Sequence, residues 1–337
     1  MNDYNNNFTP QDNFIPIKPD LLDLRKRSNV VGIITIVGIV AFYLISYLLS
    51  TILREILMQY PVDYSIDALP NSFFGGLVNL LALGVGGVIF IKLKKEDISK
   101  QLPFSKVNTS TLISLIIIGF SFCMLSNFLT SIFIGTTSNL GFDFSYASSS
   151  PVSNSVPEII ASVLAVAFVP AVAEEIMFRG AIMSTLRKYG DGTAILVSAI
   201  IFGLFHTNMV QIPFAFIVGV ILGWAVVYSG SMLPAILIHF TNNLFSVTSG
   251  TLQSNAERWN ISEGILSLGV SIFVVIMALS AIICAIKLSR QDKTFLYLNN
   301  YHGELEKKEI TKTIITNPAI IGTVVILIIE TINNHLP

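Results

Sequence analysis

The sequence predicts an all-α protein, a polytopic integral membrane bundle of eight or nine transmembrane helices. Its 337 residues are 53% hydrophobic and 12% charged, about half the charged fraction of a typical soluble domain. The mean hydropathy is +0.71, and apolar runs of membrane-spanning length recur along the chain. Because lipid offers no partner to a free backbone amide, each run is expected to be helical.

Nine apolar runs have the length or pattern of a membrane-spanning helix. A helix needs about 20 apolar residues to cross the hydrocarbon core. The runs lie at about 29–53, 72–91, 111–135, 157–178, 192–207, 210–229, 231–249, 263–286 and 315–332. The fifth and seventh runs are short and Gly322 interrupts the ninth, so we expect eight or nine crossings.

The positions of lysine and arginine predict a cytoplasmic N-terminus. If the runs alternate in direction from that side, most basic residues fall in cytoplasmic segments. The outer segments hold only Arg54 and Arg258, and Arg179 lies inside a run. This asymmetry follows the positive-inside rule, and one missed crossing would scramble it.

The chain divides into four parts by composition. The polar segment 1–28, rich in Asn, Asp and Pro, is expected to be a disordered cytoplasmic tail. N-terminal transmembrane helices follow at 29–135, and a core that carries intramembrane polar residues covers 155–250. C-terminal transmembrane helices occupy 263–337, where 288–313 is a charged cytoplasmic segment.

Composition also argues against several classes of function. A net charge of -1 gives no basic surface for nucleic acid. Cys123 and Cys284 both lie in apolar runs without CxxC spacing, so they are interpreted as core residues rather than a disulfide or redox pair. No internal repeat suggests a transporter built from two halves.

Five ionisable residues lie at membrane depth in the apolar runs: Glu174, Glu175, Arg179, His206 and His239. Glu158 and Glu330 lie near the ends of runs, where they can reach the interface. A charge at membrane depth costs roughly 2.5–3.5 kcal/mol on insertion scales, so such residues indicate a functional site. They concentrate in one region of the chain, which predicts that they act together.

A helical hairpin is expected to bring the acids opposite His206. Glu174 and Glu175 precede the turn at Gly190–Gly192 by about 16 residues, and His206 follows it by about 15. At about 1.5 Å per residue, both groups lie roughly 23 Å from the turn and therefore at matching depth.

A third helix adds His239 and Asn243, which are four residues apart and share one face. The turn at 228–231 places them within reach of the hairpin. Phe202 precedes His206 by four residues, so its ring is expected to pack beneath the imidazole.

This set of residues favours the activation of water. Glu175 and Arg179 have the spacing of an ion pair, which leaves Glu174 on a different helix face as the general base. Histidine and asparagine donors would stabilise the oxyanion that forms when water attacks an amide. The sequence contains neither GxSxG nor HExxH, so no serine nucleophile or local zinc motif is indicated.

Three motifs in this order resemble the CPBP family, which comprises the CAAX prenyl endopeptidases and the bacteriocin-processing or Abi-type membrane proteins. The resemblance covers about residues 155–250. The motifs are Glu174-Glu175-x-x-x-Arg179, Phe202-x-x-x-His206 and His239-x-x-x-Asn243.

The resemblance implies an intramembrane glutamate protease in a bacterial cell membrane. By motif position, Glu174 is the water-activating base and His206 helps to bind that water. His239 and Asn243 form the oxyanion site, while the acid–arginine pair of the first motif is structural support. The substrate implied is a membrane-associated peptide or protein, and a membrane protein partner is a further expectation.

Alternative functions stay open at this stage. A non-catalytic scaffold that regulates a membrane partner would use the same polar cluster as an interhelical clamp. A proton-coupled transporter is disfavoured by the single polar patch. No cofactor is expected, although one Glu and two His over three helices leave a zinc variant as an alternative.

Overall fold

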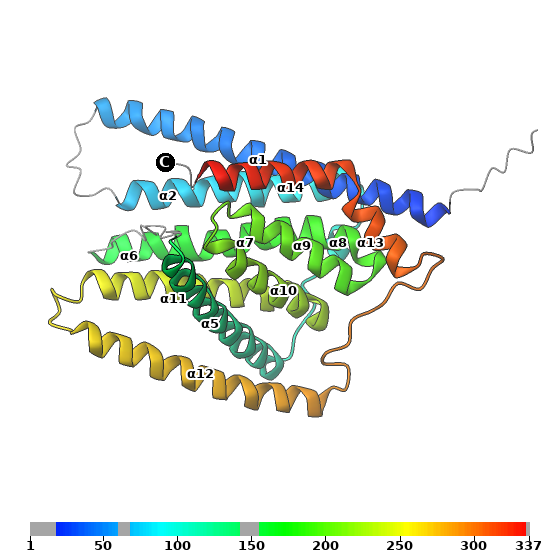
Figure 1. Cartoon of the computed structure of the whole chain (residues 1–337). Coiled ribbons are helices and arrows are strands. Elements are labelled where there is room, and N and C mark those ends of the chain that lie inside the picture. The colour runs from blue at the N-terminus through cyan, green and yellow to red at the C-terminus, as the bar shows by residue number, and fades with distance from the viewer. Residues whose placement is uncertain (1–17, 60–67, 142–154, 335–337) are drawn as a thin grey trace, which may run out of the picture.

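The computed structural model describes residues 18–59, 68–141 and 155–334, and every regular element within these ranges is a helix (Figure 1). The all-α prediction is confirmed. The elements before the central helix are α1 Pro19–Gln59, α2 Ala68–Asn79, η2 Leu80–Val85, α3 Gly86–Leu93, α4 Ile98–Gln101 and α5 Thr109–Asn139.

One long central helix follows, and its hydrogen-bonding pattern changes along its length. It consists of α6 Val156–Ser162, the π-helical η3 Val163–Phe168, α7 Val169–Glu175, the π-helical η4 Ile176–Met183, α8 Ser184–Leu186 and the 3-10 turn η5 Arg187–Tyr189. The remaining elements are α9 Asp191–Phe205, α10 Gln211–Ser229, α11 Leu233–Ser254, α12 Glu263–Gln291, α13 Lys307–Ile315 and α14 Pro318–Asn333.

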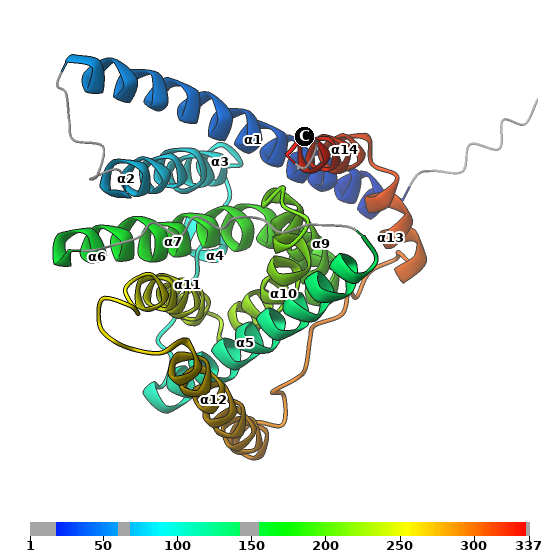
Figure 2. The ribbon, with the colours of Figure 1, turned by 60° about the vertical axis from the view of Figure 1, so that its left-hand side comes forward.

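The central helix lies between two layers of the bundle. Helices α1, α2 and α14 lie on one side of it, and α11, α10 and α5 lie on the other (Figures 1 and 2). Helix α12 packs mainly against α5 at the outside of the bundle. The hairpin predicted at Gly190 is confirmed, since α9 starts directly after that glycine, whose φ is 106°.

A helix occupies each of the nine predicted runs, but not all of them meet a strict criterion for a membrane span. Six helices of the described chain are long and apolar enough, or seven if α13 and α14, bent by 55°, form one span. Helix α9 has only 15 residues, and α11 carries the polar sequence HFTNN. The count of eight or nine therefore stays a prediction.

The first helix begins earlier than the sequence suggested. Residues 1–17 lie outside the described residues, whereas 19–28 of the predicted tail are the first turns of α1. Leu24 is fully buried there, and Lys188 pairs with both Asp20 and Asp23 at 3.1 and 2.9 Å. These contacts with the hairpin turn stabilise helix where composition alone indicated disorder.

A tyrosine from the segment before α13 closes the same end of the bundle. The Tyr301 hydroxyl donates a hydrogen bond to Asp20, and the Tyr301 ring stacks on Tyr189. Burial and this hydrogen bond raise the pKa of Tyr301, so the hydroxyl stays a donor at neutral pH. The contact joins α1, the hairpin turn and the C-terminal part of the chain.

Helix α14 approaches α1 closely at Gly32. A Cβ built on Gly32 would lie 2.4 Å from the backbone carbonyl carbon of Ala319, and the Thr323 hydroxyl donates to the Gly32 carbonyl at 3.1 Å. Only glycine allows this backbone contact, and it fixes the position of α14 along α1.

We expect Gly32→Ala to destabilise the protein because the added methyl group must push α14 away from α1. Such overpacking costs about 1–3 kcal/mol. Thermal unfolding of purified protein in detergent measures the effect. Gly269→Ala is the matched control, since nothing lies within 4 Å of its Cβ position. Equal unfolding temperatures for the two variants would contradict the role of Gly32.

Candidate active site

Glu174 and Glu175 form the C-terminal end of α7, between the π-helical segments η3 and η4. π-helical turns inside α-helices are frequently found at functional sites. The two glutamates are consecutive, so their side chains project from the helix about 100° apart. They consequently meet different surroundings.

Glu175 and Arg179 form a completely buried ion pair, as their spacing predicted. Arg179 Nη1 donates to Glu175 Oε1 at 2.8 Å, and both side chains have zero exposure. Arg179 Nη2 donates to the Gly219 carbonyl at 3.1 Å, and its guanidinium lies 4.6 Å from the centre of the Phe202 ring. The pair therefore connects η4 with α9 and α10.

His239 lies between the two carboxylates. Its Nδ1 is 3.0 Å from Glu175 Oε1, and its Nε2 is 3.8 Å from Glu174 Oε2. The carboxylate of Glu175 can only accept, so Nδ1 is the donor in that contact. This orientation directs the other ring nitrogen toward Glu174.

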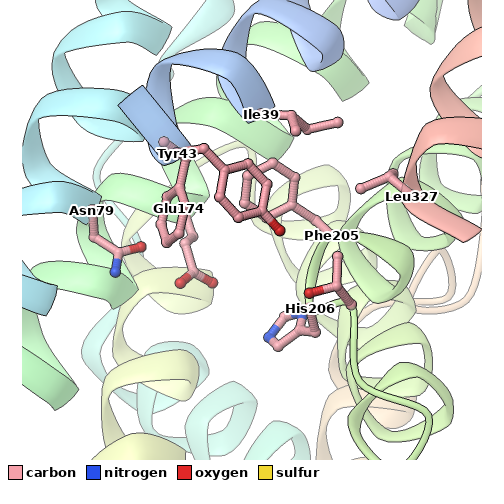
Figure 3. A pocket seen from close by; sticks show the side chains of 9 residues that line it. Ile39, Tyr43, Asn79, Glu174, Phe205, His206 and Leu327 are labelled. Carbon is pink, nitrogen blue, oxygen red and sulfur yellow. The ribbon is translucent and has the colours of Figure 1, made fainter. Parts of the chain in front are cut away.

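Glu174 faces a cavity of about 190 Å³. Figure 3 shows its carboxylate and the ring of His206 directed into the same space, with Asn79 and Tyr43 at its sides. The structure thus brings together the acid and the imidazole that the hairpin was predicted to align. The cavity, termed the Glu174 cavity below, is lined by Ile39, Phe42, Tyr43, Asn79, Glu174, Phe205, His206, Thr207 and Leu327.

His206 is held at the C-terminal end of α9. Its Nδ1 lies 2.8 Å from the Phe202 carbonyl and is the donor, which leaves Nε2 for other contacts. The Phe202 ring packs edge-on against the imidazole at 5.0 Å between centres, as predicted. Thr207 follows with φ 46°, and the Asn334 amide donates to its carbonyl and hydroxyl at 3.1 and 3.0 Å.

Asn243 does not line the Glu174 cavity. The side-chain nitrogen of Asn243 lies 3.5 Å from the backbone carbonyl of Val166. Pro170, four residues after Val166, has no N–H to donate to that carbonyl. The side-chain oxygen of Asn243 accepts from Asn242 at 3.2 Å. Asn243 instead lines a second, larger cavity of about 830 Å³, which we term the α5–α11 cavity. His206 lines both cavities. Because Asn243 and Glu174 line different cavities, the oxyanion role of Asn243 stays a prediction.

Several lining residues were not identified from the sequence. Tyr43 and Asn79 come from α1 and α2, Leu327 comes from α14, and Thr207 follows His206 directly. A search limited to ionisable residues passes over them, although Asn79 is a polar residue within an apolar run. The Gly219 carbonyl, which accepts from Arg179, was not identified from the sequence either.

The donor set gives no compact metal centre. Within the described ranges, no group of three or more His, Cys, Asp or Glu side chains is close enough to hold a metal ion. Glu174 and His206 line one cavity, whereas Glu175 is buried against Arg179 and His239. The need for a metal stays untested.

Comparison with known proteins agrees with the motif order. Residues 156–245 match the profile of the family described as Type II CAAX prenyl endopeptidase Rce1-like, which confirms the family resemblance. No curated protein and no solved structure matches the chain. The matched segment contains every residue of the three motifs, whereas Tyr43, Asn79 and Leu327 lie outside it.

We expect Arg179→Met to destabilise the protein by about 3–5 kcal/mol, because it leaves Glu175 as a buried charge without its cation. The double variant Glu175→Gln/Arg179→Met removes both charges and should recover much of the loss. Chemical unfolding in detergent measures both.

Lys188→Met is the control for an exposed ion pair, with an expected effect within about 1 kcal/mol. If the double variant is no more stable than Arg179→Met alone, the stability lost in Arg179→Met does not come from the unpaired buried charge of Glu175.

Proposed function

We propose that this protein is an intramembrane endopeptidase that hydrolyses a peptide bond of a membrane-associated substrate. The starting point is the match of residues 156–245 to the Type II CAAX prenyl endopeptidase Rce1-like family. One observation carries the proposal: Glu174 and His206, from different helices, face one cavity within the apolar bundle. His239 adds a ring nitrogen 3.8 Å from the Glu174 carboxylate.

In the proposed reaction, Glu174 takes a proton from a water molecule that is also bound by His206. The water oxygen attacks the carbonyl carbon of the scissile amide and forms a tetrahedral oxyanion. The C–N bond then breaks, and Glu174 gives its proton to the leaving nitrogen. The products are a carboxylic acid and an amine, and Glu174 regains its starting form. Transfer of the acid proton to the amine then gives a carboxylate and an ammonium group.

His239 and Asn243 are proposed to stabilise the oxyanion. Glu175 holds His239 through Nδ1, so donation from Nε2 requires a ring that carries both protons. Asn243 would donate from the α5–α11 side, which places the scissile bond near His206, the residue that lines both cavities.

The surroundings of the site fit hydrolysis inside a membrane. Several long apolar helices and the matched family make the chain an integral membrane protein. We propose a bacterial cell membrane and a cytoplasmic N-terminus, because the basic residues follow the positive-inside rule in that orientation. Every group used in the reaction belongs to the chain, so the proposed mechanism includes no metal step.

Glu174→Gln tests the proposal, because it removes the base while keeping the shape of the side chain. We expect turnover to fall at least about 100-fold. Proteomic comparison of membranes from wild-type and variant cells should reveal uncleaved membrane-associated peptides. Purified wild-type protein should cleave these peptides. Glu263→Gln, in the first turn of α12, is the matched control.

Retained turnover in Glu174→Gln would overturn the protease proposal. A scaffold that regulates a membrane partner gives a different pattern: its function in a complementation assay should survive both Glu174→Gln and His206→Ala.

A further inference from the structure

A polar stripe runs along α11 beyond Asn243. Asn243, Ser246, Ser249 and Gln253 recur at intervals of three or four residues and all line the α5–α11 cavity. Such spacing places them on one helix face. The opposite wall of the cavity contains Asn127 and hydroxyl residues of α5, together with residues of α10 and α12.

The amides of this cavity have unused hydrogen-bonding capacity. The side chains of Asn127, Gln211 and Gln253 make no hydrogen bond with other described residues. A carboxamide offers both a donor and an acceptor, as a peptide group does. Lipid chains cannot satisfy these groups, whereas water or an extended polypeptide can.

The cavity also adjoins the candidate active site. His206 lines it as well as the Glu174 cavity. Among the lining residues that the structure describes, His206 alone has a titratable side chain. The α5–α11 cavity has a volume of about 830 Å³, which falls in the range of small-molecule sites, about 300–1,000 Å³. The two cavities therefore lie on either side of His206, next to the Glu174 carboxylate.

We propose that the α5–α11 cavity binds an extended, uncharged stretch of the substrate on one side of the scissile bond. This inference rests on the proposed endopeptidase function. Ten residues of α11 separate Asn243 from Gln253, about 15 Å. Extended chain covers that distance in four or five residues. Side-chain amides replace the hydrogen bonds that the unwound substrate backbone loses when it leaves water or its own helix.

The described lining residues include no Asp, Glu, Lys or Arg, and this determines which substrate residues the cavity accepts. A lysine or aspartate of the substrate would be transferred into the cavity without an ion-pair partner, which is costly. The stretch is therefore composed of apolar and small polar residues. The cavity extends along α11 toward its C-terminal end, away from the Lys/Arg-rich end of the bundle.

Photo-crosslinking tests the assignment without requiring activity. Full-length Glu174→Gln protein carries p-benzoylphenylalanine in place of Ser246 and is irradiated in cell membranes. The control carries it in place of Ile272, an exposed residue of α12 that does not line the cavity. We expect Ser246 to capture polypeptides at least tenfold more than Ile272, and to capture those that accumulate uncleaved.

Each outcome decides one proposal. Equal capture at both positions, or lipid adducts alone at Ser246, overturns the binding inference even if peptides accumulate in Glu174→Gln cells. Capture only of polypeptides that the wild type does not cleave also overturns the inference that this cavity binds substrate, whereas the protease proposal is decided separately by turnover in Glu174→Gln.

Kinetics on an accumulating peptide give a second test. Gln253→Leu should raise KM at least tenfold with kcat nearly unchanged, because it removes ground-state contacts far from the reacting atoms. Placing one lysine within the four or five residues bound here should lower kcat/KM of the wild type at least tenfold. Ile272→Leu is the control. A Gln253→Leu variant that matches this control, or that loses kcat alone, contradicts the inference.

Discussion

The buried Glu175–Arg179 ion pair constrains the arrangement of the helices around it. Neither charge can be buried alone at low energetic cost, so their partners must be supplied by neighbouring helices. Gly219 of α10 supplies a carbonyl, Phe202 of α9 supplies a ring face, and His239 of α11 supplies Nδ1. Three helices are thereby fixed relative to η4, and each of them carries or adjoins a candidate site residue.

The same constraint separates the roles of the two adjacent glutamates. Glu175 points into the protein, where its Oε1 accepts from Arg179 and His239. Glu174 projects about 100° away around the helix and faces the cavity. Because Glu175 fixes the ring of His239, it also determines which nitrogen of that ring is directed toward Glu174. The support pair thus orients the residues proposed to react.

Relations within one helix or across one turn could be predicted from the sequence. The Glu175–Arg179 pair and the Phe202–His206 contact follow from a spacing of four residues, and the hairpin depth follows from helix rise and the turn at Gly190. These arguments need only local geometry. They gave the all-helical fold and the meeting of Glu174 with His206, in agreement with the structure.

Relations between distant helices could not be predicted in this way. Tyr43 and Leu327 reach the Glu174 cavity from opposite ends of the chain, and neither carries a charge that marks it. His239 and Asn243 share a helix face, but Asn243 lies about one turn further along α11. At that height it lines the α5–α11 cavity instead of the Glu174 cavity. The early start of α1 likewise depends on Lys188, which is remote in sequence.

The contact between Asn334 and Thr207 has a consequence for how the protein matures. A residue 127 positions later in the chain fixes the backbone directly after His206, and α14 supplies Leu327 as part of the cavity wall. During synthesis on the ribosome, this wall is missing until α14 has been translated and inserted into the bilayer. A nascent chain therefore completes this pocket only after α14 has joined the bundle.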